Sequence, residues 1–252
     1  TADDSGSSST DNRTNKTAYT INATGLEPGA TVELKEGATV IATAIVSAGG
    51  TASFSLTGAT EGAHNYVVAQ TDAAGNVSTT ATLLTVTVDV TAPAAPTADL
   101  VATSDTGSSS TDNITSDTTP TISGAPVEPG AIVTLYDSDG TTVLGTTVAD
   151  GSGNWSITPS SVLSSGVHNF TTKQTDTAGN QGPASAPLAV NIDTNPPVAP
   201  TVNSRTLSDT TPVLTGTTAT GAALNAGEVL TVTVSGATYA VTPNASGQWS
   251  LD

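Results

Sequence analysis

Two nearly identical stretches, QTDAAGN at residues 70–76 and QTDTAGN at residues 174–180, each place an aspartate just before a Gly-Asn turn. Carboxylate oxygens are ligands that Ca²⁺ prefers. The chain has 22 acidic residues against five Lys and Arg, and a formal net charge of −17. Asp72 and Asp176 therefore have few cationic side chains to pair with, and both are candidate metal ligands. The alternative is that each carboxylate caps backbone N–H groups of a hairpin turn in which glycine supplies a positive φ.

The acidic composition excludes several classes of partner. Nucleic acids and anionic membrane surfaces require cationic patches, so neither is expected to bind. The chain lacks cysteine, which excludes disulfides and thiolate metal sites. No apolar run approaches the roughly 18 residues of a membrane span, so no membrane insertion is expected. Thr1 does not begin a signal peptide, and the chain starts as though it were cut from a longer one.

Internal repeats define the organisation of the chain. DDSGSSSTDNRT at 3–14 matches SDTGSSSTDNIT at 104–115, and EPGATVEL at 27–34 matches EPGAIVTL at 128–135. A third copy begins after Pro200, where SDTTPVLTG echoes SDTTPTISG. The repeats, separated by Pro-rich joints, predict three domains: 1–92 with its N-terminal strand cut, 93–197, and an incomplete 198–252 that lacks its last two strands.

Within each copy, apolar residues alternate with polar ones and turn signals recur every 8–14 residues. This pattern predicts an all-β fold of tandem immunoglobulin-like β-sandwiches, each with about seven antiparallel strands, arranged as an extended rod. Phe54, Trp155 and Trp249 are predicted at equivalent, inward-facing strand positions. His64 and His168 stand apart from any catalytic pattern and are expected to be structural.

This topology sorts the acidic residues between the two ends of each sandwich. Loops at one end of the second domain, together with the end of the last strand of the first, should form a junction. Clustered like charges repel, and a hard divalent cation would relieve that repulsion, so Ca²⁺ is predicted there. The candidate ligands are Asp89, the Thr91 carbonyl, Glu128, Asp150 and Asp176. Asp72 is expected to face a preceding domain that the sequence lacks.

A second acidic cluster is predicted at the opposite end of each sandwich. It is a candidate calcium site within a domain or at a junction, and its residues are Asp4, Asp11, Asp105, Asp112, Asn113 and Asp137. The second junction would use Asp193 and Glu228. YDSDGTT at 136–142 resembles the start of an EF-hand loop, but Val148 stands where that loop needs Glu. An ordinary hairpin turn is therefore expected there.

The set of motifs DTGSSSTDNITSDTTPTISG, EPGAIVTLYD, DGSGNWSITPS, QTDTAGN and IDTNPPVAP closely resembles the bacterial Ig-like repeats of giant non-fimbrial adhesins, including biofilm-associated proteins. The resemblance implies type I secretion, a cell-surface location and a role in adhesion, biofilm formation or virulence. It also implies long rods stiffened by Ca²⁺ at domain junctions. By this resemblance, Asp89 and Asp193 at strand ends and Asp72 and Asp176 in turns would be ligands. Asp105 and Asp112 would also contribute.

The third copy departs from this family pattern, because it lacks an EPG turn and the last loop. Its junction is expected to bind Ca²⁺ differently.

Three functions follow from the sequence. The favoured one is a non-enzymatic rod segment of a secreted adhesin. Its partners would be neighbouring repeats and, through the full-length protein, the host surface or biofilm matrix, with the chain itself monomeric. The first alternative is a module that binds a host receptor or glycan directly, which would require an exposed aromatic patch. The second is an accessory repeat of a cell-wall enzyme, although the chain shows no nucleophile elbow, His-rich metal motif or phosphate loop.

Overall fold

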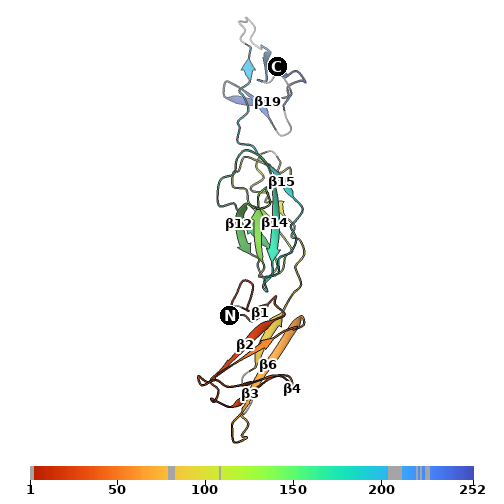
Figure 1. Ribbon diagram of the computed structural model, residues 1–252. Helices are drawn as coiled ribbons and strands as arrows, with labels where there is room; N and C mark the ends of the chain where they lie inside the picture. The colour runs from red at the N-terminus through yellow and green to blue at the C-terminus, as the bar shows by residue number, and fades with distance from the viewer. Residues whose placement is uncertain are drawn as a thin grey trace. The chain divides into compact units, whose positions relative to one another are not determined.

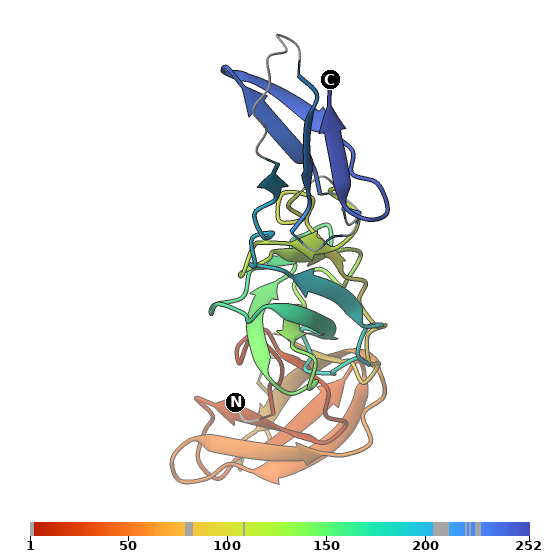
Figure 2. The ribbon, with the colours of Figure 1, turned by 90° about the horizontal axis from the view of Figure 1, so that it is seen from above.

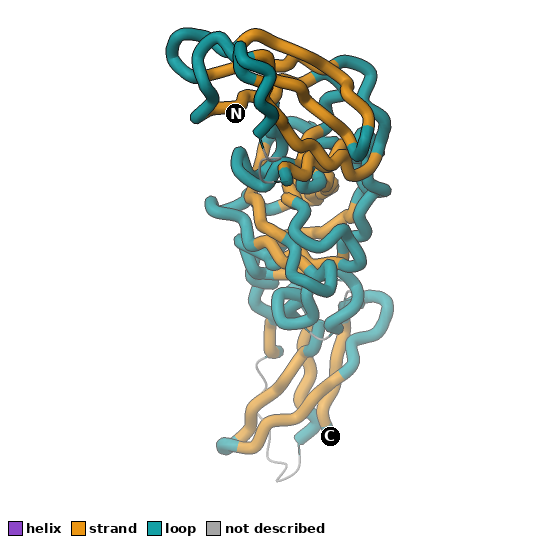
Figure 3. Tube along the Cα trace, turned by 90° about the horizontal axis from the view of Figure 1, so that it is seen from below, coloured by secondary structure: helices purple, strands orange, loops and turns teal. Residues whose placement is uncertain are grey.

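The computed structural model describes residues 3–78, 83–107, 109–203, 212–219, 221, 223–224 and 228–252. Every regular element in this part of the chain is a β-strand, and Figure 3 shows only strands and loops there. Helices that could cross a membrane are absent from the described residues. The all-β prediction is therefore confirmed.

The first repeat consists of two sheets (Figures 1 and 2). One has five strands in the order β1-β7-β6-β3-β4, and the other pairs β2 with β5. The strands are β1 (Arg13–Thr14), β2 (Tyr19–Thr24), β3 (Thr31–Glu36), β4 (Thr39–Ile45), β5 (Thr51–Leu56), β6 (Gly62–Thr71) and β7 (Leu84–Val88).

The core of the first repeat follows the period-2 pattern of its strands. Val32 and Leu34 of β3 are fully buried, whereas the intervening Glu33 is partly exposed. The Tyr19 and Tyr66 hydroxyls share a hydrogen bond of 2.7 Å in this core. The buried residues are Tyr19, Ile21, Ala30, Val32, Leu34, Val46, Ala52, Phe54, Tyr66, Val86 and Val88.

The second repeat has the same plan. One sheet runs β12-β11-β14-β15-β9, and the other runs β13-β10-β8. Its strands are β8 (Asp99–Leu100), β9 (Ile114–Thr115), β10 (Ile122–Gly124), β11 (Ile132–Tyr136), β12 (Val143–Val148), β13 (Trp155–Ile157), β14 (Gly166–Thr175) and β15 (Leu188–Ile192). Figure 1 shows β12, β14 and β15 in the larger sheet.

One feature of both repeats differs from the prediction of purely antiparallel strands. β1 pairs in parallel with β7, and β9 pairs in parallel with β15. β9 lies at the end of the repeated motif SDTGSSSTDNIT, residues 104–115. Each pairing is only two residues long, too short to produce a visible alternation in the sequence.

The third repeat has five strands in its described part: β16 (Thr201–Val202), β17 (Leu214–Thr217), β18 (Leu230–Val234), β19 (Ala237–Val241) and β20 (Gln248–Leu251). They form a sheet in the order β16-β17-β20 and a β18–β19 hairpin. Leu230, Val232 and Trp249 form the buried cluster between them.

The chain forms two compact units. The first contains Thr1–Asp99, Ser123–Ile157 and Phe170–Leu188, and the second contains Leu100–Ile122, Thr158–Asn169 and Ala189–Asp252. The first repeat and the loops of the second repeat that carry Glu128 and Asp176 therefore belong to one unit. The domain limits expected from the repeats stay predictions.

The buried aromatic residues correct one predicted equivalence. The Leu26 N–H donates to the Gly50 carbonyl oxygen in the first repeat, and the Val127 N–H donates to the Gly153 carbonyl oxygen in the second. Both distances are 3.0 Å. Counting from these glycines, Ala52 rather than Phe54 corresponds to Trp155. Phe54 lies opposite Ile21 in the β2–β5 pair, whereas Trp249 lies opposite Gly216 in the β17–β20 pair. All three aromatic residues are nevertheless buried, as predicted.

His64 has a structural role in the first repeat. Its Nε2 lies 2.8 Å from the carbonyl oxygen of Thr60, and its Nδ1 lies 2.8 Å from Glu36 Oε1. The Thr60 carbonyl raises the pKa of His64, and Glu36 raises it further, because both stabilise the imidazolium. His168 similarly lies 3.0 Å from the carbonyl oxygen of Ser164 through Nε2.

The raised pKa predicts that stability of the first repeat depends on pH. The folded pKa exceeds the unfolded value of about 6.5, so the contribution of His64 is complete below that pH and is lost as the pH rises through the folded pKa. We expect the urea midpoint, followed by the ring resonances of Tyr19 and Tyr66, to be higher at about pH 5.5 than at about pH 8. His64→Gln should remove the part of this difference that depends on the imidazolium. An unchanged pH dependence in that variant would contradict the assignment.

Candidate functional site

The two Asp-Ala/Thr-Ala-Gly-Asn stretches form the same turn. Asp176 Oδ1 accepts hydrogen bonds from the backbone N–H groups of Ala178, Gly179 and Asn180 at 2.7–2.9 Å. Its Oδ2 accepts one from Asn180 Nδ2 at 2.8 Å. The interpretation of a capped hairpin turn is therefore confirmed for Asp176.

The Asp72 carboxylate accepts the corresponding hydrogen bonds from Ala74 N–H, Asn76 N–H and Asn76 Nδ2, at 2.7–2.8 Å. The side chain and backbone of Asn76 lower the pKa of Asp72, because they stabilise the carboxylate. Gly75 and Gly179 have φ of 90° and 99°, the left-handed region that favours glycine. Both copies thus use the same local chemistry.

The two turns differ in their surroundings, because only Asp176 is deeply buried, with an exposed fraction of 1%. The first repeat covers it. Ser5 Oγ donates to the carbonyl oxygen of Ala178 at 2.6 Å, and Asn180 Nδ2 donates to that of Asp89 at 2.8 Å. These contacts bind the turn of the second repeat to the loop before β1 and to the end of β7.

Glycine permits this close approach. Gly6 has φ of 90°, and a Cβ there would overlap the carbonyl oxygen of Thr177. Gly182 similarly faces the carbonyl of Pro93. The second repeat is therefore in direct backbone contact with the first repeat at Gly6 and with the Pro-rich joint at Gly182, and a larger side chain would separate these backbones.

Gln174 adds a further link. Its Oε1 accepts from Glu128 N–H at 3.0 Å, and its Nε2 donates to the carbonyl oxygen of Ala94 at 2.7 Å. It thereby connects the strand before the turn to a neighbouring loop and to the Pro-rich joint. We call the bonds Ser5–Ala178, Asn180–Asp89 and Gln174–Ala94 the junction contacts.

The sequence-based prediction missed the residues that make these contacts. Gln174 and Asn180 are identical in both copies as Gln70 and Asn76, and Gln70 Oε1 likewise accepts from Glu27 N–H at 2.8 Å. The identity between copies was the available signal. The prediction favoured the acidic residues because their charge attracts Ca²⁺ more strongly than a neutral amide side chain does.

The charges of two predicted ligands act on a third, Glu128, at the junction. Loss of surrounding water raises the pKa of Glu128, and the negative charges of Asp176 and then Asp89 raise it further. Asp89 Oδ1 accepts from Thr91 N–H at 3.2 Å, while Thr91 Oγ1 donates to Glu61 Oε2 at 2.8 Å. The shared metal site of Asp89, Glu128 and Asp176 stays a prediction.

Asp150 has a more local role than predicted. Its carboxylate accepts from Ser152 N, Asn154 N and Asn154 Nδ2, all within its own turn. The backbone and side chain of Asn154 lower its pKa, and no other carboxylate contributes to that shift. The structure therefore places Asp150 in a self-contained turn.

The loops before β1 and β9 hold a repeated arrangement. Asp4 Oδ2 accepts from Asn12 N–H and Asp105 Oδ2 accepts from Asn113 N–H, both at 3.2 Å. Asn12 and Asn113 both have φ of 58°. In each loop the other carboxylate oxygen, Oδ1, is buried and has no hydrogen-bond donor among the described residues. Asp105 is only 5% exposed.

The remaining predicted ligands lie in local turns or at the entry to the third repeat. Asp11 and Asp112 accept from the N–H groups of Arg13 and Ile114 at 3.1 Å. Asp193 accepts from Asn195 N–H at 2.9 Å. Asp137 accepts from Ser138 N–H, and neighbouring Asp139 accepts from Thr141 and Thr142, which gives the predicted hairpin turn. Glu228 lies beside Pro197 and Val198 at the entry to the third repeat.

The described residues contain no group of three or more His, Asp or Glu side chains spaced to hold a metal ion. The calcium prediction therefore stands on pairs of interacting carboxylates and on the two buried acceptor oxygens.

Comparison with known proteins assigns the fold to a family. The bacterial Ig-like domain matches the chain twice, over residues 1–90 and 91–194. These matches cover most of the sequence, and the chain belongs to the bacterial Ig-like domain family. Curated proteins give no match.

Several solved structures are similar. Fibronectin(III)-like modules of Clostridium thermocellum CbhA are 21% identical over 71% of this chain and 86% of that chain, with a TM-score of 0.41. A tetra-tandem repeat from the extending region of a large adhesion protein is 25% identical over 94% of this chain and 62% of that chain, with a TM-score of 0.35. A structure of a 1.5-MDa bacterial ice-binding adhesin is 22% identical over 92% of this chain and 78% of that chain, also with a TM-score of 0.35.

Proposed function

We propose that this chain is a non-enzymatic rod segment of a secreted bacterial surface adhesin, in which tandem Ig-like repeats hold a binding region away from the cell. The observation that supports this most is the set of junction contacts, which join the first repeat to the buried turn of the second. An array that transmits force needs defined angles between repeats, and direct backbone contact at Gly6 favours one such angle. The motif set shared with giant adhesins supports the same function.

We further propose that Ca²⁺ binds at these junctions. Asp4 Oδ1 and Asp105 Oδ1 fit this role because each is a buried anionic oxygen without a donor in the described chain. A buried carboxylate oxygen is costly to leave unpaired, and a hard cation is one partner that would stabilise it. Asp11, Asp112 and Asn113 lie in the same loops as these two aspartates.

At the junction between the first two repeats, Asp89, Glu128 and Asp176 would share a cation. Asp176 Oδ1 accepts three hydrogen bonds, whereas Oδ2 accepts one, so Oδ2 is the oxygen more available to a cation. Asp193 and Glu228 would serve the second junction, and Asp72 a preceding repeat. When bound, Ca²⁺ would neutralise these carboxylates and bridge the loops that carry them.

Small-angle X-ray scattering in about 5 mM Ca²⁺ and in EGTA tests this proposal. The Ca²⁺ concentration exceeds the dissociation constants of extracellular modules, which are roughly 10⁻⁴–10⁻³ M. We expect a larger and better-defined maximum dimension with Ca²⁺, because relief of carboxylate repulsion favours one interdomain angle. Asp89→Asn combined with Glu128→Gln should reduce this response while leaving the capped turn of Asp176 intact.

Asp139→Asn is the matched control, because Asp139 lies in an exposed hairpin turn and should leave the response unchanged. Equal scattering profiles with Ca²⁺ and EGTA would contradict calcium-dependent stiffening. A full response in the Asp89→Asn/Glu128→Gln variant would contradict the ligand assignment alone.

A further inference from the structure

The first repeat has a pocket between β4 and β5, which belong to different sheets. Among the described residues, β4 pairs only with β3, and β5 pairs only with β2. The pocket has a volume of about 450 Å³, and small-molecule sites in proteins span roughly 300–1,000 Å³. It is lined by the end of β3, by β4, by the end of β5 with the loop that follows, and by the start of β6. We call it the β4–β5 pocket.

The second repeat fills the corresponding space with a leucine. The Ala59 N–H donates to the Thr17 carbonyl oxygen at 3.0 Å, and the Leu163 N–H donates to the Thr118 carbonyl oxygen at 2.8 Å. Ala59 therefore corresponds to Leu163. Leu163 is buried in the second repeat. The smaller side chain of Ala59 leaves the space beside it open in the first repeat, where it lines the β4–β5 pocket.

A second leucine of the second repeat also has an altered counterpart. Ile41 and Leu144 are the residues without a partner at the irregular points of the β3–β4 and β11–β12 pairs. Leu144 is 4% exposed, whereas Ile41 is 38% exposed and lines the pocket. The β4–β5 pocket thus has an aliphatic surface that a ligand can reach, and the second repeat buries the equivalent residue in its own core.

Glu36 is the one carboxylate that lines the pocket. Its side chain is 40% exposed, and its Oε1 lies 2.8 Å from His64 Nδ1. Its Oε2 accepts no hydrogen bond from the described residues. The other lining residues before His64 fall within residues 37–60, a stretch without any charged side chain. The pocket therefore combines an aliphatic surface with one available carboxylate oxygen.

A primary ammonium group on an alkyl chain matches this combination. The alkyl chain would contact Ile41 and Leu56, while the ammonium group reaches Glu36 Oε2. A guanidinium group binds best to two carboxylate oxygens side by side, and here His64 engages Oε1, so a single-point ammonium contact is favoured. The net charge of −17 also attracts cationic ligands over longer distances.

The lysines of this chain do not supply that group. Two copies would repel each other, because each carries a net charge of −17. Each of the three lysines also contacts a side chain already: Lys16 lies 3.7 Å from Asp3, Lys35 lies 2.9 Å from Glu33, and Lys173 lies 5.6 Å from the ring centre of Tyr136. The ligand would therefore come from a different protein.

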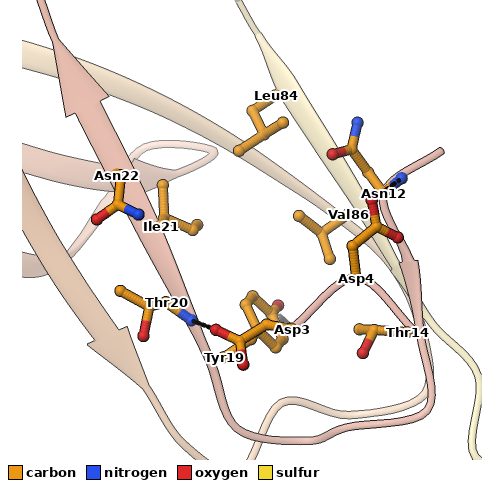
Figure 4. A pocket seen from close by; sticks show the side chains of 10 residues that line it. All are labelled: Asp3, Asp4, Asn12, Thr14, Tyr19, Thr20, Ile21, Asn22, Leu84 and Val86. Atoms are coloured by element: carbon orange, nitrogen blue, oxygen red, sulfur yellow. Dashed lines mark hydrogen bonds between the residues drawn. The ribbon is translucent and has the colours of Figure 1, made fainter. Parts of the chain in front are cut away.

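We propose that the β4–β5 pocket is a binding site for a lysine side chain presented by a basic partner protein. This goes beyond the proposed function, because the first repeat would bind a partner as well as extend the array. Figure 4 shows another pocket of the same repeat, lined by Asp3, Asp4 and Asn12. The two pockets share no lining residue, and no residue of the β4–β5 pocket is a proposed calcium ligand. Lysine binding and calcium binding can therefore be tested separately.

Titration of the full chain with N-acetyl-lysine N′-methylamide tests the proposal. NMR follows the amide resonances of Leu56 and Ala59 and the ring resonances of Tyr66. The titration is made at about pH 8, where less of His64 is protonated and competes for Glu36. We expect saturable shifts at these three residues. N-acetyl-norleucine N′-methylamide has a similar aliphatic side chain without the ammonium group and should cause no saturable shift.

Two charge variants test the role of Glu36. Glu36→Gln should raise the Kd by about tenfold or more, because the ammonium group loses its charged partner. Glu33→Gln is the matched control, since it removes the same charge from β3 at a residue that does not line the pocket. Its Kd should stay within about twofold of the original value. Equal Kd values in the two variants would overturn the proposal.

Ala59→Leu tests the pocket itself, because it introduces the residue that fills this space in the second repeat. We expect the saturable shifts to disappear while the urea midpoint is retained or raised. Retained binding in this variant, or no saturable shift in the original chain, would overturn the proposal. Tighter binding of cadaverine than of the lysine amide would overturn it in favour of a free diamine. A dimer mass by light scattering that Glu36→Gln abolishes would overturn it in favour of a second copy.

Discussion

Replacing Asp176 by alanine should destabilise the second repeat by about 3 kcal/mol. One buried and two partly buried backbone N–H groups would lose the carboxylate acceptor. Each buried unsatisfied donor costs roughly 1–3 kcal/mol, although water entering the site would recover part of this. The same change should weaken the junction contacts, because the turn that presents the Ala178 carbonyl and Asn180 to the first repeat would no longer be held in place.

The urea midpoint, followed by Trp155 fluorescence in a Trp249→Phe background, measures the first effect. Hydrogen exchange at Ser5 and Gly6 measures the second, and it should become faster. Asp72→Ala is the matched control, because Asp72 caps the same turn but is exposed to water. Its effect should be much smaller. Equal losses in the two variants would show that burial by the first repeat does not matter.

The contrast between these aspartates shows what the sequence can and cannot predict here. The turn itself was predictable, since Asp, Gly and Asn at this spacing satisfy local backbone requirements. The burial of Asp176 was not, because it depends on Ser5 and Gly6, which lie about 170 residues away and carry no distinctive chemistry. Neutral contacts of this kind leave no charge or hydropathy pattern.

The fold was predictable from alternation and repeats, but alignment by motif misplaced one aromatic residue. The second repeat has a longer turn between β11 and β12, which shifts the correspondence by two residues before β5 begins. The prediction that Phe54 and Trp155 are equivalent did not include this shift. Backbone hydrogen bonds of Gly50 and Gly153 define the register correctly, because they are independent of side-chain type.

The sequence identifies the acidic loop residues proposed to bind Ca²⁺ as a group but does not distinguish among them. Aspartates at loop ends can either cap turns or bind cations, and both uses favour the same residues. Asp150 and Asp139 have their carboxylates occupied by their own turns, whereas Asp4 and Asp105 keep one buried oxygen without a donor. Only the three-dimensional structure separates these cases.

Replacing Gly124 by alanine should destabilise the second repeat by about 2–4 kcal/mol, the range expected when a side chain is forced into a filled core. A Cβ at this position would overlap the carbonyl oxygen of Thr97 and lie 2.8 Å from Trp155 Cζ2. Either the segment leading into β8 must leave the edge of β10, or the indole must move. The third repeat has the same arrangement, in which Gly216 faces Thr201 and Trp249.

Gly151→Ala is the control, because a Cβ there meets no atom within 4 Å. We expect Gly124→Ala to lower the urea midpoint and to speed hydrogen exchange in β10, while Gly151→Ala changes neither. Equal midpoints in the two variants would contradict the steric argument. Loss of β10 protection with a retained Trp155 emission maximum would show that β8, rather than the indole, moves.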